Sequence, residues 1–311
     1  MRAAVYRSLG GPDVVEVAEV DKPVPGLSEI RIKVQAAALN PADAAAWTGG
    51  YFPAPPEGIA YGLGWDIAGV VDAVGPGTHW RPGQPVIAFS YGFPLGLNRG
   101  QAEYVVVPAH AIAAAPTGVD PVQASTIPLN GLTAAQSVEL LGIQAGQTVL
   151  ITGAEGAVGG YAVQLAKRRG AVVIASDRSP DGKFATKVAG ADVYVPASQA
   201  PADAVRKVRP EGVDAVLDTA RLGQAVIGAV ADGGRFVTTR LDALPQAERG
   251  IRILLTQVGP DGAMLTTLSD LAAAGDLALR VAETYPLQEA AKAYARLTGG
   301  GLRGRVVLTV E

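Results

Sequence analysis

The sequence predicts an α/β protein with two parts, a compact β domain and a doubly wound parallel sheet of six strands. Residues 1–120 contain short apolar runs separated by many prolines and glycines, which indicates short strands joined by irregular loops. From about residue 121, strand-like runs alternate with helical ones. This alternation is typical of parallel strands joined by crossover helices, and six such strands fit one doubly wound sheet.

The first part owes its predicted strands to alternating apolar residues. We expect strands at residues 27–38, 67–74 and 103–107, with prolines marking the loops between them. The closing residues return to mixed character. There we expect helices at 262–274 and 287–297 and a last strand at 305–310.

The second part contains the six strands of the predicted sheet. They are expected at residues 148–152, 171–176, 193–195, 213–217, 235–239 and 251–256. Between the first two, residues 158–169 have helical spacing. Three basic residues close that helix, where cations suit the negative end of the dipole, and Gly170 follows as a stop signal.

Composition limits the possible functions. The chain has 311 residues, 26 basic and 29 acidic, so its formal charge is −3, which argues against a nucleic-acid partner. It has no cysteine and two histidines, His79 and His110, which excludes disulfides and zinc sites built on sulfur or on three histidines. Without a signal peptide or an apolar stretch of membrane-spanning length, we expect no membrane partner and a cytoplasmic location.

A glycine motif lies between the first strand and the first helix of the predicted sheet. It reads Gly153-Ala154-Glu155-Gly156-Ala157-Val158-Gly159. Glycines there permit a tight turn and keep side chains away from a pyrophosphate, which the helix N-terminus attracts. We therefore predict that Gly153, Gly156, Ala157, Val158 and Gly159 bind a dinucleotide; an ordinary glycine turn is the alternative. We expect the Glu155 side chain to point to solvent, away from the anion.

The end of the second strand bears on which dinucleotide is bound. Asp177 lies 21 residues after Gly156, near the spacing for a ribose 2′-hydroxyl contact, which favours NAD. Ser176, Arg178 and Lys183 could instead hold a 2′-phosphate. For Arg178 and Lys183, a solvated charged loop is equally consistent with the sequence.

Motifs in a fixed order run along nearly the whole chain. They are Met1-Arg2-Ala3-Ala4-Val5, Ala38-Leu39-Asn40-Pro41-Ala42-Asp43, Gly49-Gly50-Tyr51, Gly64-Trp65-Asp66-Ile67-Ala68-Gly69, Gly100-Gln101-Ala102-Glu103-Tyr104, Gly131-Leu132-Thr133-Ala134, the glycine motif, Gly190-Ala191-Asp192, Asp214-Ala215-Val216-Leu217-Asp218, Gly233-Gly234-Arg235 and Arg303-Gly304-Arg305-Val306-Val307. In this order they resemble the zinc-independent, zeta-crystallin-like quinone oxidoreductases of the medium-chain dehydrogenase/reductase superfamily.

The resemblance implies a GroES-like β domain made from both ends of the chain and a Rossmann domain between them. We place the GroES-like catalytic domain at 1–120 and 277–311 and the Rossmann cofactor-binding domain at 121–276. The resemblance also implies an active site between the domains, NADPH as cofactor with NADH left open, and a homodimer. Zinc-dependent relatives use Cys, His and acidic ligands, whereas this chain has Asn40 and Gly64-Trp65-Asp66 at the corresponding places. The resemblance therefore predicts a site without metal.

The resemblance also suggests the site residues. Asn40, Asp43 and Tyr51 are the catalytic candidates; a turn former, a helix-start residue and a packed aromatic are their respective alternatives. Asn40 would also bind the cofactor, as would Thr133 and Arg303. Phe93, Pro94, Leu95 and Leu97 suggest an apolar entrance for a small-molecule substrate, and a surface loop is the alternative.

Hydride transfer without a metal needs hydrogen-bond donors for the negative charge that develops on the substrate oxygen. Quinones and enones suit such a site better than simple alcohols, whose oxidation needs a base or a metal to remove the hydroxyl proton. A short-chain dehydrogenase is disfavoured because no tyrosine has a lysine four positions later. The alternative function is non-catalytic NADPH binding, as a redox sensor or a structural protein.

Overall fold

The computed structural model describes residues 1–50, 53–91, 96 and 99–311. Two compact units divide these residues: Met1–Leu129 with Gly259–Glu311, and Asn130–Val258. Tyr51 and the predicted entrance at Phe93, Pro94, Leu95 and Leu97 lie outside the described residues. In the fold class, the predicted α/β architecture with a parallel six-stranded sheet is confirmed.

The first unit contains two β-sheets. One has the strand order β2-β1-β4, and the other has the order β15-β16-β3-β5-β6-β8 with β7 paired to β3. The bounds are β1 (Arg2–Tyr6), β2 (Val15–Glu19), β3 (Glu29–Ala38), β4 (Tyr61–Gly62), β5 (Asp66–Val74), β6 (Pro85–Phe89), β7 (Tyr104–Pro108), β8 (Ile112–Ala114), β15 (Val281–Pro286) and β16 (Arg305–Thr309). The strands predicted at 27–38, 67–74, 103–107 and 305–310 are present as β3, β5, β7 and β16.

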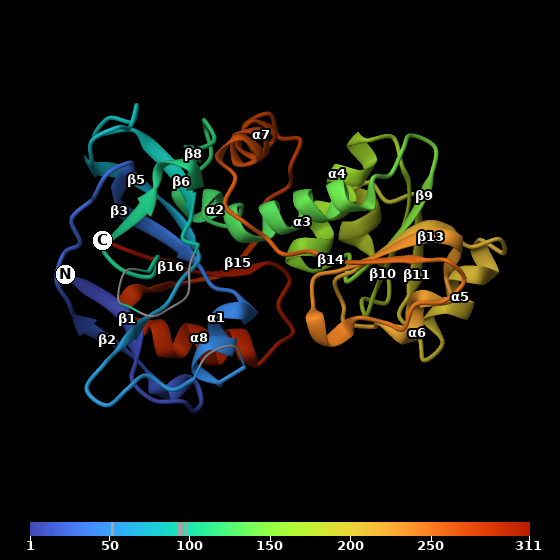
Figure 1. Ribbon diagram of the computed structural model, residues 1–311, viewed down its shortest axis with the longest axis horizontal. Helices are drawn as coiled ribbons and strands as arrows, with labels where there is room; N and C mark the ends of the chain where they lie inside the picture. The colour runs from blue at the N-terminus through green and yellow to red at the C-terminus, as the bar shows by residue number, and fades with distance from the viewer. Residues whose placement is uncertain (51–52, 92–95, 97–98) are drawn as a thin grey trace. The chain divides into compact units, whose positions relative to one another are not determined.

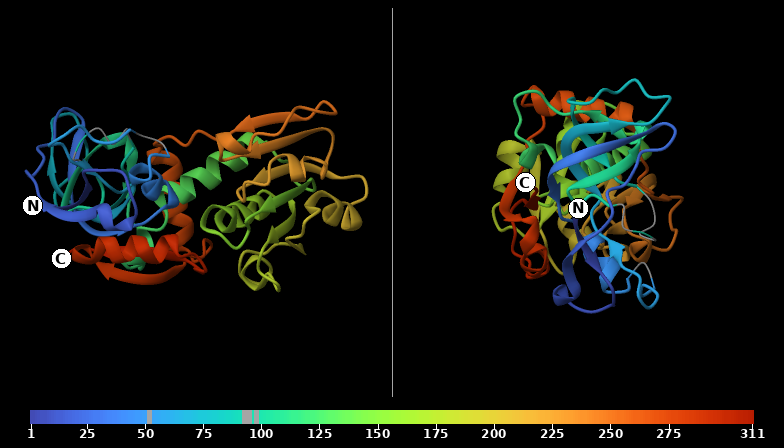
Figure 2. Two further views of the ribbon diagram at one scale, coloured as in Figure 1. Left: turned by 90° about the horizontal axis from the view of Figure 1, so that it is seen from below. Right: turned by 90° about the vertical axis from the view of Figure 1, so that its left-hand side faces the viewer.

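Both ends of the chain contribute to this unit. The blue N-terminal strands and the red C-terminal elements share it in Figure 1, and both termini are marked on it in Figure 2. Its helices are α1 (Pro41–Trp47), α2 (Pro121–Ala124), α7 (Gly262–Ala273) and α8 (Ala290–Thr298). The core joins them: the rings of Trp47 in α1 and Tyr294 in α8 meet edge to face at 5.8 Å, and both side chains are buried.

Helix α7 lies in the first compact unit, whereas the prediction placed it in the domain at 121–276. The Ser269 hydroxyl of α7 donates to the backbone oxygen of Ala114 in β8 at 2.7 Å. Gly262, at the helix start, approaches the backbone oxygens of His110 and Ile112 so closely that a Cβ would lie within 2.9 Å of both. These contacts attach residues 262–273 to the first unit.

The second unit contains one parallel sheet in the order β11-β10-β9-β12-β13-β14. Its strands are β9 (Thr148–Thr152), β10 (Val172–Asp177), β11 (Val193–Pro196), β12 (Val213–Asp218), β13 (Val230–Thr238) and β14 (Arg252–Leu255). All six match predicted strands. Chain order runs outward in both directions from the neighbours β9 and β12, which makes the carboxyl ends of these strands the ligand-binding edge in sheets of this kind.

Helices connect the strands of the second unit. They are α3 (Pro128–Leu141), which begins in the first unit, α4 (Ala157–Arg168), α5 (Pro201–Val208) and α6 (Gln224–Ile227). The helix predicted at 158–169 is confirmed as α4. Helix α3 escaped prediction because it is apolar around most of its circumference and largely buried, so it lacks the one-sided pattern that reveals a surface helix. In the described residues, no helix combines the length and hydropathy needed to cross a membrane.

Candidate functional site

Three buried polar residues meet where β3 ends and two of its paired strands begin. Asn40 follows β3, Asp66 opens β5 and Arg305 opens β16; both strands run antiparallel to β3. The sheet order therefore gathers residues that are far apart in the sequence at one sheet end. Their exposed fractions are 2%, 0% and 6%.

Hydrogen bonds occupy both oxygens of the Asp66 carboxylate. Oδ2 accepts from Asn40 Nδ2 at 2.8 Å and from Arg305 Nη2 at 3.1 Å, while Oδ1 accepts from the backbone N–H of Leu129 at 2.5 Å. Arg305 Nη2 also donates to the Asn40 side-chain oxygen at 2.8 Å and to the Leu39 carbonyl at 2.7 Å. The result is a buried, charge-paired network. Burial raises the pKa of Asp66, and the Arg305 guanidinium opposes that rise.

Asp43 is a second buried carboxylate, joined to the same network through Asn40. It occupies the third position of α1, where its Oδ2 accepts from the Asn40 backbone N–H at 2.8 Å and its Oδ1 from the Gly64 N–H at 3.1 Å. These bonds match the capping role that Asp43 had as its alternative. Burial raises the pKa of Asp43 to about 7, although the Asn40 N–H and the charge of Arg99 pull it down.

Arg99 and Gln101 belong to this region and were not predicted as site residues. The buried Arg99 guanidinium lies 4.1 Å from the centre of the Trp65 ring. Gln101 accepts a 2.9 Å hydrogen bond from the Tyr294 hydroxyl. Gly64 leaves space for Gln101, because a Cβ on Gly64, whose φ is +108°, would lie 2.5 Å from the backbone nitrogen of Gln101. Gln101 belongs to the motif Gly100-Gln101-Ala102-Glu103-Tyr104, and this position was the signal in the sequence that could have marked it as a site residue.

The second unit contains the predicted dinucleotide loop. Gly153 follows β9 with φ +65°, and Gly156 precedes the first turn of α4, which contains Ala157, Val158 and Gly159. A Cβ on Gly159 would lie 2.1 Å from the Gly153 carbonyl oxygen. The loop and the helix start are therefore packed as closely as glycine allows, and the first N–H groups of the helix have no intrahelical acceptor. This backbone arrangement fits a bound pyrophosphate.

The prediction for Glu155 is wrong. The residue is 7% exposed, and its Oε1 accepts from the buried backbone N–H of Ala185 at 2.9 Å. A buried N–H needs an acceptor, and this requirement holds the carboxylate inside the unit rather than in solvent.

The end of β10 lies beside the loop. Asp177 Oδ2 accepts from the Glu155 backbone N–H at 3.1 Å, and its Oδ1 accepts from the N–H of Arg178 at 2.7 Å. Ser176 is buried, whereas Arg178 is exposed. Lys183 is also exposed and forms a 2.9 Å ion pair with Asp181.

The two remaining candidates occupy different units. Thr133 is in α3, one turn before Ser137, whose hydroxyl is 2.8 Å from that of Thr256 just after β14. This contact brings α3 to the carboxyl-end edge of the sheet, on the same side as the glycine loop. Arg303 is exposed in the turn before β16 and belongs to the first unit.

Asp218 is a further polar residue at the carboxyl-end edge that sequence reasoning did not select. It ends β12, and its Oδ1 accepts from the Thr152 hydroxyl at 2.6 Å. Its Oδ2 accepts from the Gly223 N–H at 2.8 Å. Asp218 therefore ties the end of β9, just before the glycine loop, to the turn after β12.

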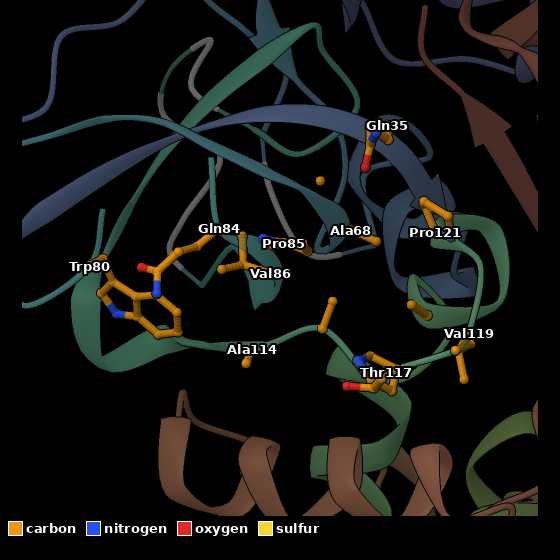
Figure 3. Close-up of a pocket in the computed structure, with 15 residues that line it drawn as sticks. Gln35, Ala68, Trp80, Gln84, Pro85, Val86, Ala114, Thr117, Val119 and Pro121 are labelled. Carbon is orange, nitrogen blue, oxygen red and sulfur yellow. The ribbon is translucent and has the colours of Figure 1, made fainter. Parts of the chain in front are cut away.

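A hollow of about 460 Å³ in the first unit is separate from the predicted residues. Figure 3 shows Trp80 and Gln84 at one side of it and Pro121 at the other. None of the predicted site residues lines it. In the described part of the chain, no cluster of three or more His, Asp or Glu side chains could hold a metal ion.

The chain matches two family models and is similar to several known proteins. Residues 26–117 match the alcohol dehydrogenase GroES-like domain, and residues 189–308 match the zinc-binding dehydrogenase model. A solved NAD-dependent alcohol dehydrogenase is 33% identical, with a TM-score of 0.87 and complete coverage of both chains. The quinone oxidoreductase from Coxiella burnetii is 26% identical, with a TM-score of 0.85, 100% of this chain and 99% of that chain covered.

Two curated relatives differ greatly in length. The phthioceranic/hydroxyphthioceranic acid synthase of Mycobacterium tuberculosis is 31% identical over 98% of this chain, but the chain spans only 15% of that relative. The NADPH-dependent alkenal/one oxidoreductase of Arabidopsis thaliana is 29% identical over 99% of this chain and 79% of its own length.

Proposed function

The chain is an oxidoreductase of the medium-chain dehydrogenase/reductase superfamily. We propose that it reduces quinones or α,β-unsaturated carbonyls with a nicotinamide cofactor and without zinc. Two relatives support this substrate class, because one is named a quinone oxidoreductase and the other an alkenal/one oxidoreductase. The alcohol dehydrogenase relative supports the wider class of hydride transfer.

The observation that carries the proposal of a site without zinc is that both oxygens of the Asp66 carboxylate already accept hydrogen bonds. In the zinc-dependent pattern a histidine and an acidic residue follow a glycine, and here Trp65 and Asp66 follow Gly64. Asp66 gives one oxygen to Arg305 and Asn40 and the other to a backbone N–H. A metal ion would have to compete with the buried Arg305 guanidinium for this carboxylate. Its binding would break the ion pair and leave the positive charge of Arg305 uncompensated by Asp66.

The bound nicotinamide nucleotide would supply the hydride. In this proposal Arg305 and Asp66 are positioning residues, because their hydrogen bonds fix the side chain of Asn40 at the end of β3. Asp43 can hold a proton on its carboxylate at neutral pH, since its pKa is raised to about 7. Asn40, Asp43 and Tyr51 remain the catalytic candidates for stabilising an oxyanion or supplying a proton.

The cofactor proposal rests on the glycine loop and on Thr133. The family resemblance and the named cofactor of the Arabidopsis relative favour NADPH, whereas Asp177 favours NADH. Ser176, Arg178 and Lys183 are the candidates for a 2′-phosphate, and Arg303 remains a cofactor-binding candidate with no assigned group. The homodimer is likewise a proposal from the resemblance.

A turnover assay tests the proposed function. The purified protein, dialysed against a chelator, is mixed with NADH or NADPH and with a panel of quinones, enones and alcohols, and the absorbance of the reduced nicotinamide is followed. Consumption with a quinone or enone, unchanged by the chelator, supports the proposal. Nucleotide binding with no consumption would favour the redox sensor, and chelator-sensitive alcohol oxidation would favour a metal-dependent dehydrogenase.

A further inference from the structure

The buried carboxylate of Glu155 lies in the loop proposed to bind the dinucleotide. Its backbone N–H contacts Asp177 Oδ2 at 3.1 Å, and its side chain contacts the Ala185 N–H at 2.9 Å. Glu155 thus links the glycine loop, the end of β10 and the segment that follows. An inference about this residue rests on the proposed function, because it concerns the same nucleotide site.

Charge in this region is predominantly negative. Residues 153–159 and 176–185 carry three carboxylates, Glu155, Asp177 and Asp181, and two cations, Arg178 and Lys183. One cation is already neutralised, because Lys183 Nζ lies 2.9 Å from Asp181. The exposed side chain of Arg178 is the other.

We propose that Glu155 is a specificity-determining residue that disfavours a 2′-phosphate and thereby selects NADH over NADPH. In folds of this kind the acidic residue after the second strand meets the ribose 2′-hydroxyl, and here that residue is Asp177. Glu155 adjoins Asp177 through its own backbone. A 2′-phosphate would bring about −1.5 to −2 charges to this place. Because Glu155 is a buried residue, solvent screens the repulsion of its carboxylate less than that of a surface carboxylate.

Two substitutions separate the charge of Glu155 from its hydrogen bond. Glu155→Gln removes the charge and keeps an oxygen that can accept from the Ala185 N–H. Glu155→Ala removes both. Charge repulsion therefore predicts a change in nucleotide preference for both variants, whereas a purely structural role predicts that Glu155→Ala weakens NADH and NADPH equally and that Glu155→Gln changes neither.

The experiment measures the dissociation constants of NADH and NADPH by calorimetry for the wild-type protein and each variant. Glu139→Gln is the matched control, since it removes one carboxylate from an exposed position in the same unit. Adenosine 2′,5′-bisphosphate and AMP serve as probes of the adenosine end alone. Thermal unfolding of each variant verifies that the second unit is folded.

The wild-type protein should bind NADH more tightly than NADPH. Glu155→Gln should lower the NADPH-to-NADH ratio of dissociation constants by about tenfold, with the bisphosphate following NADPH, and Glu139→Gln should leave the ratio within about twofold. The proposal is overturned if both nucleotides bind and Glu155→Gln leaves the ratio unchanged, if Glu139→Gln shifts it equally, or if the wild-type protein prefers NADPH. Absence of binding by both nucleotides would instead overturn the proposed function.

Discussion

Arg305 and Asp66 form an ion pair inside the first unit, with 3.1 Å between Nη2 and Oδ2, although 239 positions separate them in the sequence. Both side chains are buried, so each charge depends on the other and on Asn40 for compensation. The pair joins the ends of β5 and β16 through the strand that lies between them.

Asp66→Asn should destabilise the first unit, because it removes the carboxylate that pairs with the buried Arg305 guanidinium. We expect the free energy of unfolding to fall by about 3 kcal/mol, measured by urea denaturation. Glu16→Gln is the control, since Glu16 pairs with Arg7 at a half-exposed site and should cost less than about 1 kcal/mol. Equal effects of the two substitutions would contradict the importance of the buried pair.

Asp43 should make stability depend on pH. Its pKa is about 7 in the folded protein against an ordinary value of 3.8, so the folded state holds the proton more strongly than the unfolded state. The associated stability is complete below about pH 4 and is lost as the pH rises to about 7, on the order of 4 kcal/mol. Urea unfolding of the wild-type protein and of Asp43→Asn from pH 4 to pH 8 measures this difference. Parallel curves for the two proteins would refute it.

Gly159→Ala should impair both the fold of the loop and nucleotide binding. The added Cβ would lie 2.1 Å from the Gly153 carbonyl oxygen, so α4 must move away from the loop. We expect a loss of about 1–3 kcal/mol in stability, and at least about tenfold weaker NADH binding by calorimetry. Gly259→Ala is the control, because no atom lies within 4 Å of its added Cβ. Unchanged binding in Gly159→Ala would show that this close packing is unnecessary.

Tyr6 and Tyr294 should respond in opposite ways to loss of their hydroxyls. The buried Tyr6 hydroxyl has no hydrogen-bond partner in the described residues, and burial raises its pKa to about 12. Tyr6→Phe should therefore raise the free energy of unfolding by about 1 kcal/mol, whereas Tyr294→Phe breaks the bond to Gln101 and should lower it by about 1 kcal/mol. A clear destabilisation by Tyr6→Phe in thermal unfolding would contradict this expectation.

Asp177→Asn should weaken NADH binding more than NADPH binding. The amide keeps one acceptor for the backbone N–H of Glu155 or Arg178 but loses the charge that favours a ribose hydroxyl. We expect about tenfold weaker NADH binding by calorimetry, and a smaller loss for NADPH. Asp203→Asn, in α5, is a control for the change in net charge. Equal weakening of both nucleotides would mean that Asp177 has only a structural role.

Local patterns were enough to predict most of the sheet of the second unit. Buried parallel strands such as β9 and β12 are continuous apolar runs, and α4 starts at a glycine loop and ends at basic residues. Helix α3 gave no such pattern, because its burial on most sides removes the contrast between two faces.

The candidate site was predictable only where its residues are close in sequence. Asn40 and Asp43 are three positions apart, so one motif contains both. Asp66 and Arg305 meet through the pairing of β16, β3 and β5, which no local pattern encodes. The prediction that the Glu155 side chain points to solvent was wrong because the buried Ala185 N–H, which donates to its carboxylate, is 30 positions away in the sequence.

The interruption of the first unit by residues 130–258 has a consequence during translation. A ribosome releases the chain from the N-terminal side, so β9 through β14 emerge before β16 exists. Until β16 is synthesised, the edge of β3 that pairs with it stays exposed, and an exposed strand edge promotes aggregation. The inserted unit can already fold during this time. The unit whose synthesis starts first is therefore the one that matures last.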